Sequence, residues 1–200
     1  GHFVNEQMKD AFVDFLVQSG CLRFGQFTLK SGAASPFFIN LGDIDDGAQM
    51  AQLGTYLAQL CAESYPDGTI LFGPAYKGIS LATATAIAAH HHHGRTYGIC
   101  FDRKEAKGHG EQGVYIGAKP KADSTVVLID DVISSGGTKL DAARALKRDF
   151  DVRMDAIIVA VDRRTQGHED DPELPPIRSL IQLEDIACYL DRNQQAERAE

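Results

Sequence analysis

Two acidic residues, Asp130 and Asp131, follow an apolar run and precede a short loop of hydroxyl residues and glycines. The run at 126–129 reads Val-Val-Leu-Ile, and the loop at 134–138 reads Ser-Ser-Gly-Gly-Thr. Neighbouring side chains on a strand face opposite ways, so we do not expect these acids to share one proton as an acid–base pair. They suit the binding of hydroxyl groups or of metal-bound water. The alternative is a plain turn, in which an Asp caps the next helix and the glycines reverse the chain.

The residues on either side of the acids predict a strand, a loop and a helix. A continuous apolar run with β-branched residues is typical of a strand buried on both faces of a parallel sheet. After the loop, Leu140, Ala143 and Leu146 recur at helical spacing. In open α/β sheets ligands bind beyond the carboxyl ends of the strands, where the first N–H groups of a helix can hold an anion. Residues 134–138 therefore predict a phosphate site.

Two further strands are predicted to end on the same ligand side of the sheet. Residues 69–72 lead through a Gly-Pro break into a helix of small residues at 78–89, and Lys77 stands near the start of that helix. The helix dipole disfavours a cation there, which favours an anionic ligand over a merely solvated lysine. Residues 154–161 predict the other strand, with Asp162 and Arg163 at its carboxyl end.

A hairpin-like lid is predicted near the N-terminus, where residues 24–44 read as two short extended runs around a turn rich in Ser, Gly and Pro. Lys30 stands at this turn. Of Phe37 and Phe38, which follow a proline, at least one should face whatever lies beneath. The alternative is an aromatic pair in a minor core.

The segment 102–113 carries three glycines and only one apolar residue, Ala106, so it cannot pack a core. Basic residues are concentrated here although the protein as a whole is acidic: Arg103, Lys104, Lys107 and His109. As a bare charge run this would be a solvated loop. The remaining pattern predicts helices at about 5–20, 46–63 and 138–148, strands at 97–101 and 114–116, a short strand and a helix within 177–190, and a polar, frayed tail.

The composition is that of a soluble, single-domain protein spanning residues 1–200, with 44% hydrophobic and 24% charged residues. No apolar run approaches the roughly 20 residues of a membrane span, and the net charge of −8 argues against a nucleic-acid surface. The four cysteines lie far apart, without metal-ligand spacing, and are expected as free thiols in a reducing cytoplasm. The four histidines at 90–93 fan out if they continue a helix, which favours a solvated helix end over a metal site.

The stretch VVLIDDVISSGGT, at 126–138, is similar to the ribose-phosphate signature of type I phosphoribosyltransferases. This resemblance implies that Asp130 and Asp131 hold the ribose hydroxyls of phosphoribosyl diphosphate (PRPP), while the following loop wraps its 5′-phosphate. The residues implied to contact PRPP after the acids are Val132, Ile133, Ser134, Ser135, Gly136, Gly137 and Thr138. The last two stand where many relatives have threonine and then alanine, which leaves the fine geometry of PRPP open.

Two more stretches resemble the orotate phosphoribosyltransferase family. FTLKSGAASPFFIN, at 27–40, is similar to its N-terminal segment, and RKEAKGHGE, at 103–111, is similar to its catalytic loop, which acts in the site of the partner subunit. The resemblance implies further PRPP contacts by Lys30, Tyr76, Lys77, Arg103, Lys104, Lys107 and His109. The residues implied to act in catalysis are Lys107, His109 and Asp131.

Orotate carries a carboxylate, which a guanidinium can meet through two hydrogen bonds. Arg163 is therefore the predicted base-recognition residue, by chemistry and by family position, with Arg164 as the alternative if the register is shifted. The resemblance adds Phe38, Ile39 and Ser134 to the orotate contacts.

The resemblance covers nearly the whole chain and implies a type I phosphoribosyltransferase fold, a central, mostly parallel sheet flanked by helices. Residues 1–45 would contribute a small hood over the base site. The implied reaction of orotate and PRPP gives orotidine 5′-monophosphate and diphosphate, in the synthesis of UMP, with Mg²⁺ carried mainly by PRPP and water and no metal ligand from the protein. The implied enzyme is a cytoplasmic homodimer that shares the loop 102–113 between subunits and binds neither nucleic acid nor membrane.

Two rival hypotheses remain at this point. One is a phosphoribosyltransferase for another base, which Phe38, Arg163 and the basic loop disfavour. The other is a PRPP-sensing regulator without turnover. It is disfavoured because the sequence has neither an added helix-turn-helix segment nor a broad basic face.

Overall fold

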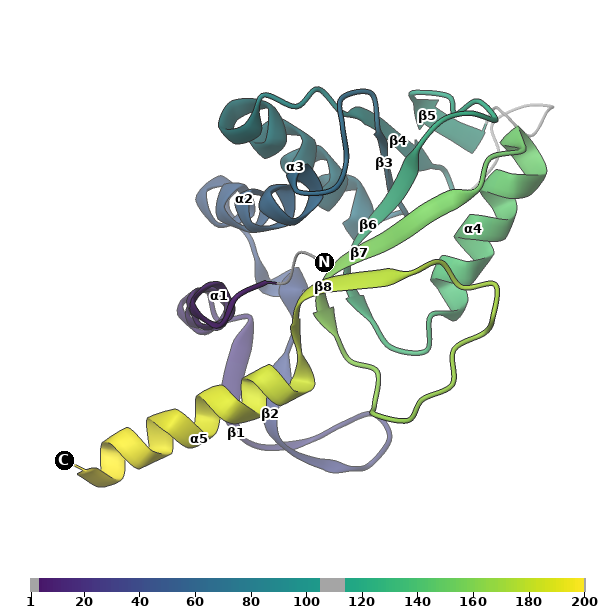
Figure 1. Cartoon of the computed structure of the whole chain (residues 1–200). Helices are drawn as coiled ribbons and strands as arrows, with labels where there is room; N and C mark the ends of the chain where they lie inside the picture. The colour runs from purple at the N-terminus through teal and green to yellow at the C-terminus, as the bar shows by residue number, and fades with distance from the viewer. Residues whose placement is uncertain (1–3, 105–113, 200) are drawn as a thin grey trace.

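The computed structural model of the chain describes residues 4–104 and 114–199, with residues 195–199 described by backbone alone. Within these residues, six strands form one sheet in the order β5-β4-β3-β6-β7-β8, and β1 and β2 form a separate hairpin (Figure 1). Neighbours in the sheet pair in parallel, except β4 and β5. Their bounds are β3 Ile70–Gly73, β4 Gly98–Asp102, β5 Tyr115–Gly117, β6 Val126–Ile133, β7 Met154–Asp162 and β8 Ile177–Gln182. The predicted mostly parallel sheet is confirmed.

Helices cover both faces of this sheet (Figure 1). On one face lie α1 Glu6–Gln18, α2 Gly47–Ala62 and α3 Lys77–His93, and on the other lies α4 Gly137–Phe150. The first two helices begin with a capping side chain, close to the predicted starts at about residues 5 and 46. Asn5 accepts a hydrogen bond from the backbone N–H of Met8, and Asp46 accepts one from Gln49, both at 2.8 Å.

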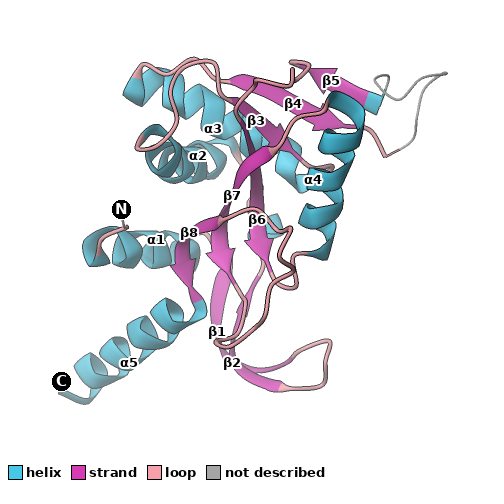
Figure 2. Cartoon of the chain, turned by 45° about the vertical axis from the view of Figure 1, so that its right-hand side comes forward, coloured by secondary structure: helices cyan, strands magenta, loops and turns pink. Residues whose placement is uncertain are grey.

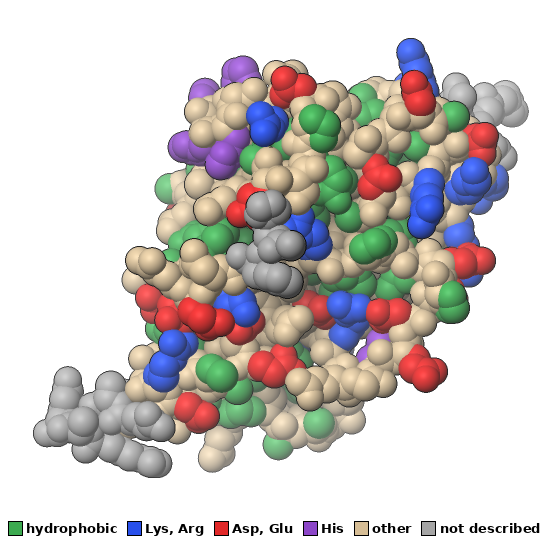
Figure 3. Space-filling view, viewed as in Figure 1, with side chains coloured by type: hydrophobic (Ala, Val, Ile, Leu, Met, Phe, Trp, Pro, Cys, Tyr) green, Lys and Arg blue, Asp and Glu red, His purple; other side chains and the backbone are tan. Residues whose placement is uncertain are grey.

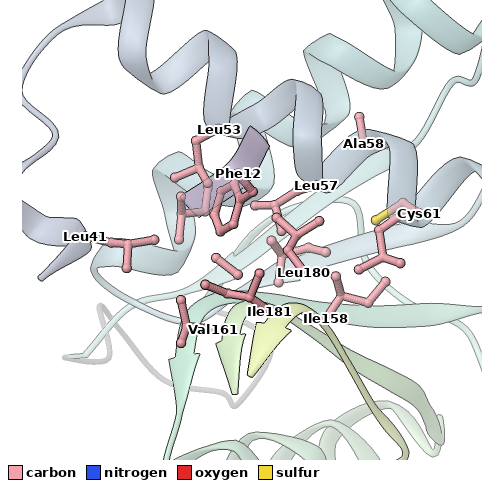
Figure 4. Packing of buried hydrophobic residues seen from close by; sticks show 14 of the residues in the cluster. Phe12, Leu41, Leu53, Leu57, Ala58, Cys61, Ile158, Val161, Leu180 and Ile181 are labelled. Atoms are coloured by element: carbon pink, nitrogen blue, oxygen red, sulfur yellow. The ribbon is translucent and has the colours of Figure 1, made fainter. Parts of the chain in front are cut away.

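The core has two parts, one on each face of the sheet. The larger part joins α1, α2 and α3 to β7 and β8, with Phe12 of α1 fully buried among them (Figure 4). The smaller part lies under α4. Strand β6 contributes Val127 and Ile129 to the first part and Val126 and Leu128 to the second. It is thus the strand buried on both faces that its continuous apolar run predicts.

The hairpin of β1 (Leu22–Thr28) and β2 (Ala34–Ile39) lies beyond the carboxyl ends of β6 and β7 (Figure 2). It packs against the C-terminal helix α5, Leu183–Ala199, where the rings of Phe24 and Tyr189 stack with centroids 6.3 Å apart. Arg192 of α5 also pairs with Asp10 of α1. The C-terminal helix therefore packs against both α1 and the hairpin. The predicted hood of residues 1–45 is supported by this helix from the other end of the chain.

Two element boundaries differ clearly from the sequence predictions. β6 does not end at the two acids but continues to Ile133, because Val132 and Ile133 stay paired with Val161 and Asp162 of β7. The predicted frayed tail is helical through Ala199. The four histidines form the solvated helix end that the sequence favoured: they belong to α3, are exposed, and precede a left-handed Gly94 with φ +63°. No helix in the described part of the chain is both long and apolar enough to cross a membrane.

Candidate active site

Each of the two acids of β6 meets a lysine from a different helix. Asp130 Oδ2 lies 3.2 Å from Nζ of Lys139 in α4, and Asp131 Oδ2 lies 3.5 Å from Nζ of Lys77 in α3. Each carboxylate also accepts a backbone hydrogen bond at 2.9 Å, Asp130 from Asp131 N–H and Asp131 from Val132 N–H. Both carboxylates are therefore held in fixed orientations. Whether they share a proton stays a prediction, because the side chain of Asp131 also acts on Asp130 and raises its pKa.

Burial raises the pKa of Asp130 to about 6. The neighbouring Lys139 ammonium lowers this pKa, whereas the negative charge of Asp131 raises it. Asp131 is itself only 8% exposed. A group that binds these carboxylates must therefore reach them from the carboxyl end of the strand, and hydroxyl donors suit two partly buried acceptors.

The loop after β6 leaves its backbone N–H groups open to an anion. α4 begins at Gly137 without any side-chain cap, although Ser135 Oγ accepts a weak hydrogen bond from Gly137 N–H at 3.4 Å. Gly136 has φ +84°, and a Cβ on it would lie 3.2 Å from Leu174, so glycine suits both its conformation and its surroundings. Ser134, Ser135, Gly137 and Thr138 are exposed, whereas Ile133 is fully buried and offers only its backbone. The arrangement is that of a helix N-terminus prepared for a phosphate.

The loop between β3 and α3 is tightly built. A Cβ on Gly73 would lie 2.2 Å from the carbonyl oxygen of Gly78, so these two backbones approach too closely for any side chain. Asp102, at the end of β4, accepts a hydrogen bond from Ala75 N–H at 2.9 Å. α3 starts without a side-chain cap at Tyr76. This loop is a second uncapped helix start at the same edge of the sheet.

Tyr76 and Lys77, both predicted to bind PRPP, lie at this second helix start. Tyr76 is 71% exposed, and Nζ of Lys104 lies 5.1 Å from the centre of its ring. Arg103 is exposed and its backbone N–H bonds to Val114 O at 2.6 Å. The structure thus brings Lys104 to Tyr76 and Lys77 to Asp131. The other two basic residues of this loop, Lys107 and His109, lie outside the described residues.

The hairpin places its predicted residues on two sides. Phe37 packs against the main core, whereas the ring of Phe38 lies 5.8 Å from that of Phe27 and 5.2 Å from the guanidinium carbon of Arg23. Ile39 belongs to the main core and is only 6% exposed, so its side chain packs rather than faces a ligand. Lys30 is exposed in the turn. Among the described residues, no hydrogen bond or ion pair connects the Lys30 side chain to the other predicted site residues.

The two arginines after β7 differ in their partners. Arg164 forms two hydrogen bonds to the carboxylate of Asp162, at 3.0 and 2.6 Å, and a third at 2.5 Å to Asp170. Burial acts to raise the pKa of Asp162, but its hydrogen bonds with Arg164 and that residue's charge outweigh burial and hold the pKa below its usual value. Arg163 has no carboxylate partner among the described residues, and its N–H bonds to Ile133 O at 2.8 Å. Arg163 is therefore the arginine left available beside the phosphate loop.

Two residues at this edge were not singled out by sequence reasoning. Lys139 lies in the first turn of α4, so the dipole argument that identified Lys77 applies to it equally and would have found it. Asp102 ends β4 in the same way that Asp162 ends β7. The sequence signal that would have identified Asp102 is a carboxylate at the end of a predicted strand. No group of three His, Cys, Asp or Glu side chains within the described residues is placed to hold a metal ion.

Comparison with known proteins gives the family. The phosphoribosyl transferase domain family matches residues 40–178. The orotate phosphoribosyltransferase of Pseudomonas fluorescens (strain SBW25) is 38% identical, and that of Pseudomonas syringae pv. tomato is 40% identical, each over 92% of this chain and 89% of the relative. The crystal structure of the Francisella tularensis orotate phosphoribosyltransferase is similar with a TM-score of 0.76 and 32% identity, over 91% of this chain and 90% of that one.

A structure of the Mycobacterium tuberculosis orotate phosphoribosyltransferase in complex with PRPP is similar with a TM-score of 0.63, over 93% of this chain and 98% of that one. At 18% identity it supports the fold alone. The sequence matches carry the assignment further, because they extend over almost the full length of both proteins. The chain belongs to the orotate phosphoribosyltransferase family.

Proposed function

We propose that this protein transfers the phosphoribosyl group of PRPP to orotate, giving orotidine 5′-monophosphate and diphosphate in pyrimidine biosynthesis. The observation that carries this proposal is the position of Arg163. Its backbone is bonded to Ile133, directly before the phosphate loop, and its guanidinium lacks a carboxylate partner in the described part of the chain. A base that carries a carboxylate would supply this partner for the Arg163 guanidinium, next to the bound ribose.

The described residues divide the work of binding and orientation. The exposed N–H groups at the start of α4 hold the 5′-phosphate, and Asp130 and Asp131 accept hydrogen bonds from the ribose hydroxyls. Lys77, already 3.5 Å from Asp131, supplies positive charge for the diphosphate. When diphosphate departs it leaves positive charge on the ribose ring, so the protein mainly stabilises the leaving group and aligns the base. No covalent nucleophile is required.

Mg²⁺ suits this site as an ion that arrives with the substrate. Mg²⁺ keeps several water ligands and is usually bound through substrate phosphates. The oxygens that the described residues offer here are those of Asp130 and Asp131, and each acid already faces a lysine within 3.5 Å. PRPP and water would therefore hold the ion, which supplies charge neutralisation at the diphosphate.

The catalytic loop and the homodimer are part of the proposal, and they rest on the family resemblance. Lys107 and His109 would act on the diphosphate bound by the partner subunit. A groove of about 300 Å³ between α3 and β4 suits a second copy of the chain. Ile87 is 54% exposed there, and Nε of Arg95 is buried without a hydrogen-bond partner in the single chain. Contact between two copies would cover the Ile87 side chain and would offer a hydrogen-bond acceptor to Nε of Arg95.

The dimer is tested by Ile87→Glu, which should lower the molar mass in light scattering from that of a dimer toward that of a monomer. Ser80→Glu on the same helix, at an exposed position outside the groove, is the control. Unchanged mass in the Ile87 variant would remove this face from the proposal.

Figure 3 shows acidic and basic side chains interspersed on the face it displays, rather than gathered into one basic area.

A cytoplasmic location is also proposed. In the described structure all four cysteines are free thiols, and burial raises the pKa of Cys61 to about 12 and that of Cys100 to about 11. Such thiols are poor nucleophiles and suit a reducing compartment.

The reaction is tested by following the PRPP-dependent loss of orotate absorbance, with uracil, adenine and hypoxanthine as alternative bases. Use of orotate alone supports the proposal. Faster use of any other base would assign the protein to a different phosphoribosyltransferase specificity, and lack of turnover with every base would favour a binding protein.

A further inference from the structure

Lys139 is a buried lysine beside an acid assigned above to the ribose site. Only 8% of its side chain is exposed, its Nζ lies 3.2 Å from Asp130 Oδ2, and 16% of the Asp130 side chain is exposed. Lys139 also stands in the first turn of α4, where the helix dipole disfavours a cation. Burial and helix position both oppose a charged lysine here, so its contact with Asp130 must offset both costs.

The charged groups that face Asp130 come from two elements. α4 brings Lys139, and β6 itself brings Asp131, whose own carboxylate is met by Lys77. The neighbouring strands bring apolar residues: Val159 of β7 is the register partner of Asp130, and β3, Ile70–Gly73, contains no charged residue. Burial already raises the pKa of Asp130 to about 6 with Lys139 present. Lys139 is therefore the cation that opposes both the burial of Asp130 and the charge of Asp131, beside the backbone hydrogen bond from Asp131 N–H.

We propose that Lys139 is a positioning residue of the ribose site, which holds Asp130 as an oriented carboxylate able to accept hydrogen bonds from the hydroxyl groups of a bound ribose. A protonated Asp130 would present a donor in place of one acceptor and would lose its attraction to Lys139. The inference rests on the proposed function for its kinetic test only, because the charge state of Asp130 can be measured without substrate.

The first test compares the KM for PRPP across pH 6–9 in the wild type and in Lys139→Met. Loss of an adjacent cation raises the pKa of an acid by about 1 to 3 units. If the pKa of Asp130 moves from about 6 to about 8, its ionised fraction at pH 7 falls from ~0.9 to ~0.1, and KM for PRPP rises about tenfold. The rise should disappear near pH 9, and kcat at saturating PRPP should change much less.

Two variants serve as controls in the same assay. Lys139→Arg keeps the charge and should keep the wild-type pH profile. Lys147→Met removes a lysine from the same helix at a position where 63% of the side chain is exposed and the partner is Asp151, and it should behave as the wild type. If Lys139→Met does not fold, Lys139→Gln replaces it and is read in the same way.

The second test needs no activity. The carboxyl ¹³C resonance of Asp130, identified by its loss in Asp130→Asn, is titrated in the substrate-free protein. A midpoint at least one unit higher in Lys139→Met supports the inference, even if the wild type fails to use orotate, in which case only the proposed function falls. Equal midpoints in the two proteins would overturn it, as would a rise in KM that is the same at every pH and is not reversed by Lys139→Arg.

Discussion

Arg163 and Arg164 are adjacent, yet replacing each with Met should damage a different property. Arg164 pairs with Asp162, of whose side chain only 6% is exposed, while 21% of the Arg164 side chain is exposed. Breaking a buried ion pair from one side costs roughly 3 to 5 kcal/mol, and the partial exposure of Arg164 reduces this to about 2 to 4 kcal/mol. For a domain of this size that corresponds to a fall in Tm of roughly 5 to 15 °C.

Arg163→Met should instead spare stability and impair orotate use. A charge-assisted hydrogen-bonded pair contributes about 1.5 to 3 kcal/mol, which is a rise of roughly 10- to 150-fold in the KM for orotate. The KM for PRPP should change by less than about threefold, because the contacts assigned to PRPP come from other residues. Calorimetry and initial-rate kinetics on the two variants separate these effects.

The stability loss in Arg164→Met should depend on pH, with a sign fixed by Asp162. The pKa of Asp162 is lower in the folded protein than in the unfolded chain, so the pair contributes stability above the unfolded value of about 3.9. That contribution is lost as the pH falls through the folded pKa. The Tm difference between wild type and Arg164→Met should therefore be full above about pH 5 and shrink toward pH 3. A large orotate effect in Arg164→Met with little change in Tm would refute this division of roles.

Three further predictions concern the PRPP side of the site. Asp131→Asn should raise the KM for PRPP at least tenfold while circular dichroism stays unchanged; full activity would mean that this acid only shapes the strand end. Asp102→Ala removes the acceptor of Ala75 N–H and should raise the KM for PRPP several-fold. Asp102→Asn keeps an acceptor oxygen and should have a KM for PRPP close to that of the wild type. Lys107→Ala and Asp131→Asn should each be nearly inactive as homodimers, but a mixed dimer purified with two tags should regain close to half of the wild-type rate. A mixed dimer no more active than its parents would mean that the loop acts in its own subunit or has no catalytic part.

The length of β6 shows where sequence reasoning ended too early. Two consecutive acids normally mark the end of a buried strand, because a charge buried without a partner is costly. Here the partners come from elsewhere in the chain, Lys77 from α3 and Lys139 from α4. With both charges met, the strand keeps its pairing with β7 to Ile133. A pattern along one segment cannot register such long-range partners.

The C-terminal helix was predicted too short for a related reason. Its sequence is polar, and it was predicted to fray beyond residue 190. In the structure it is held along α1, where Tyr189 OH donates to Asp14 at 2.5 Å and Arg192 pairs with Asp10. The strands and helices with strong apolar periodicity and capping residues were predictable, because those signals are local. Partners contributed by tertiary packing were not.

The choice between Arg163 and Arg164 likewise needed the structure. The sequence places both at the carboxyl end of β7 and allows either to meet a carboxylate. The bidentate contact of Arg164 with Asp162 favours Arg163 as the proposed ligand contact, since an arginine already paired with a buried acid is less available for a ligand. Nothing in the local pattern of the two residues reveals that contact.

The most direct test of the central claim is ³¹P NMR of the protein with PRPP, orotate and Mg²⁺. The predicted result is the loss of PRPP with equal amounts of orotidine 5′-monophosphate and diphosphate appearing, and no change when orotate is omitted. Diphosphate released without orotidine 5′-monophosphate, or PRPP that remains intact in the complete mixture, would contradict the assignment of this site to phosphoribosyl transfer onto orotate.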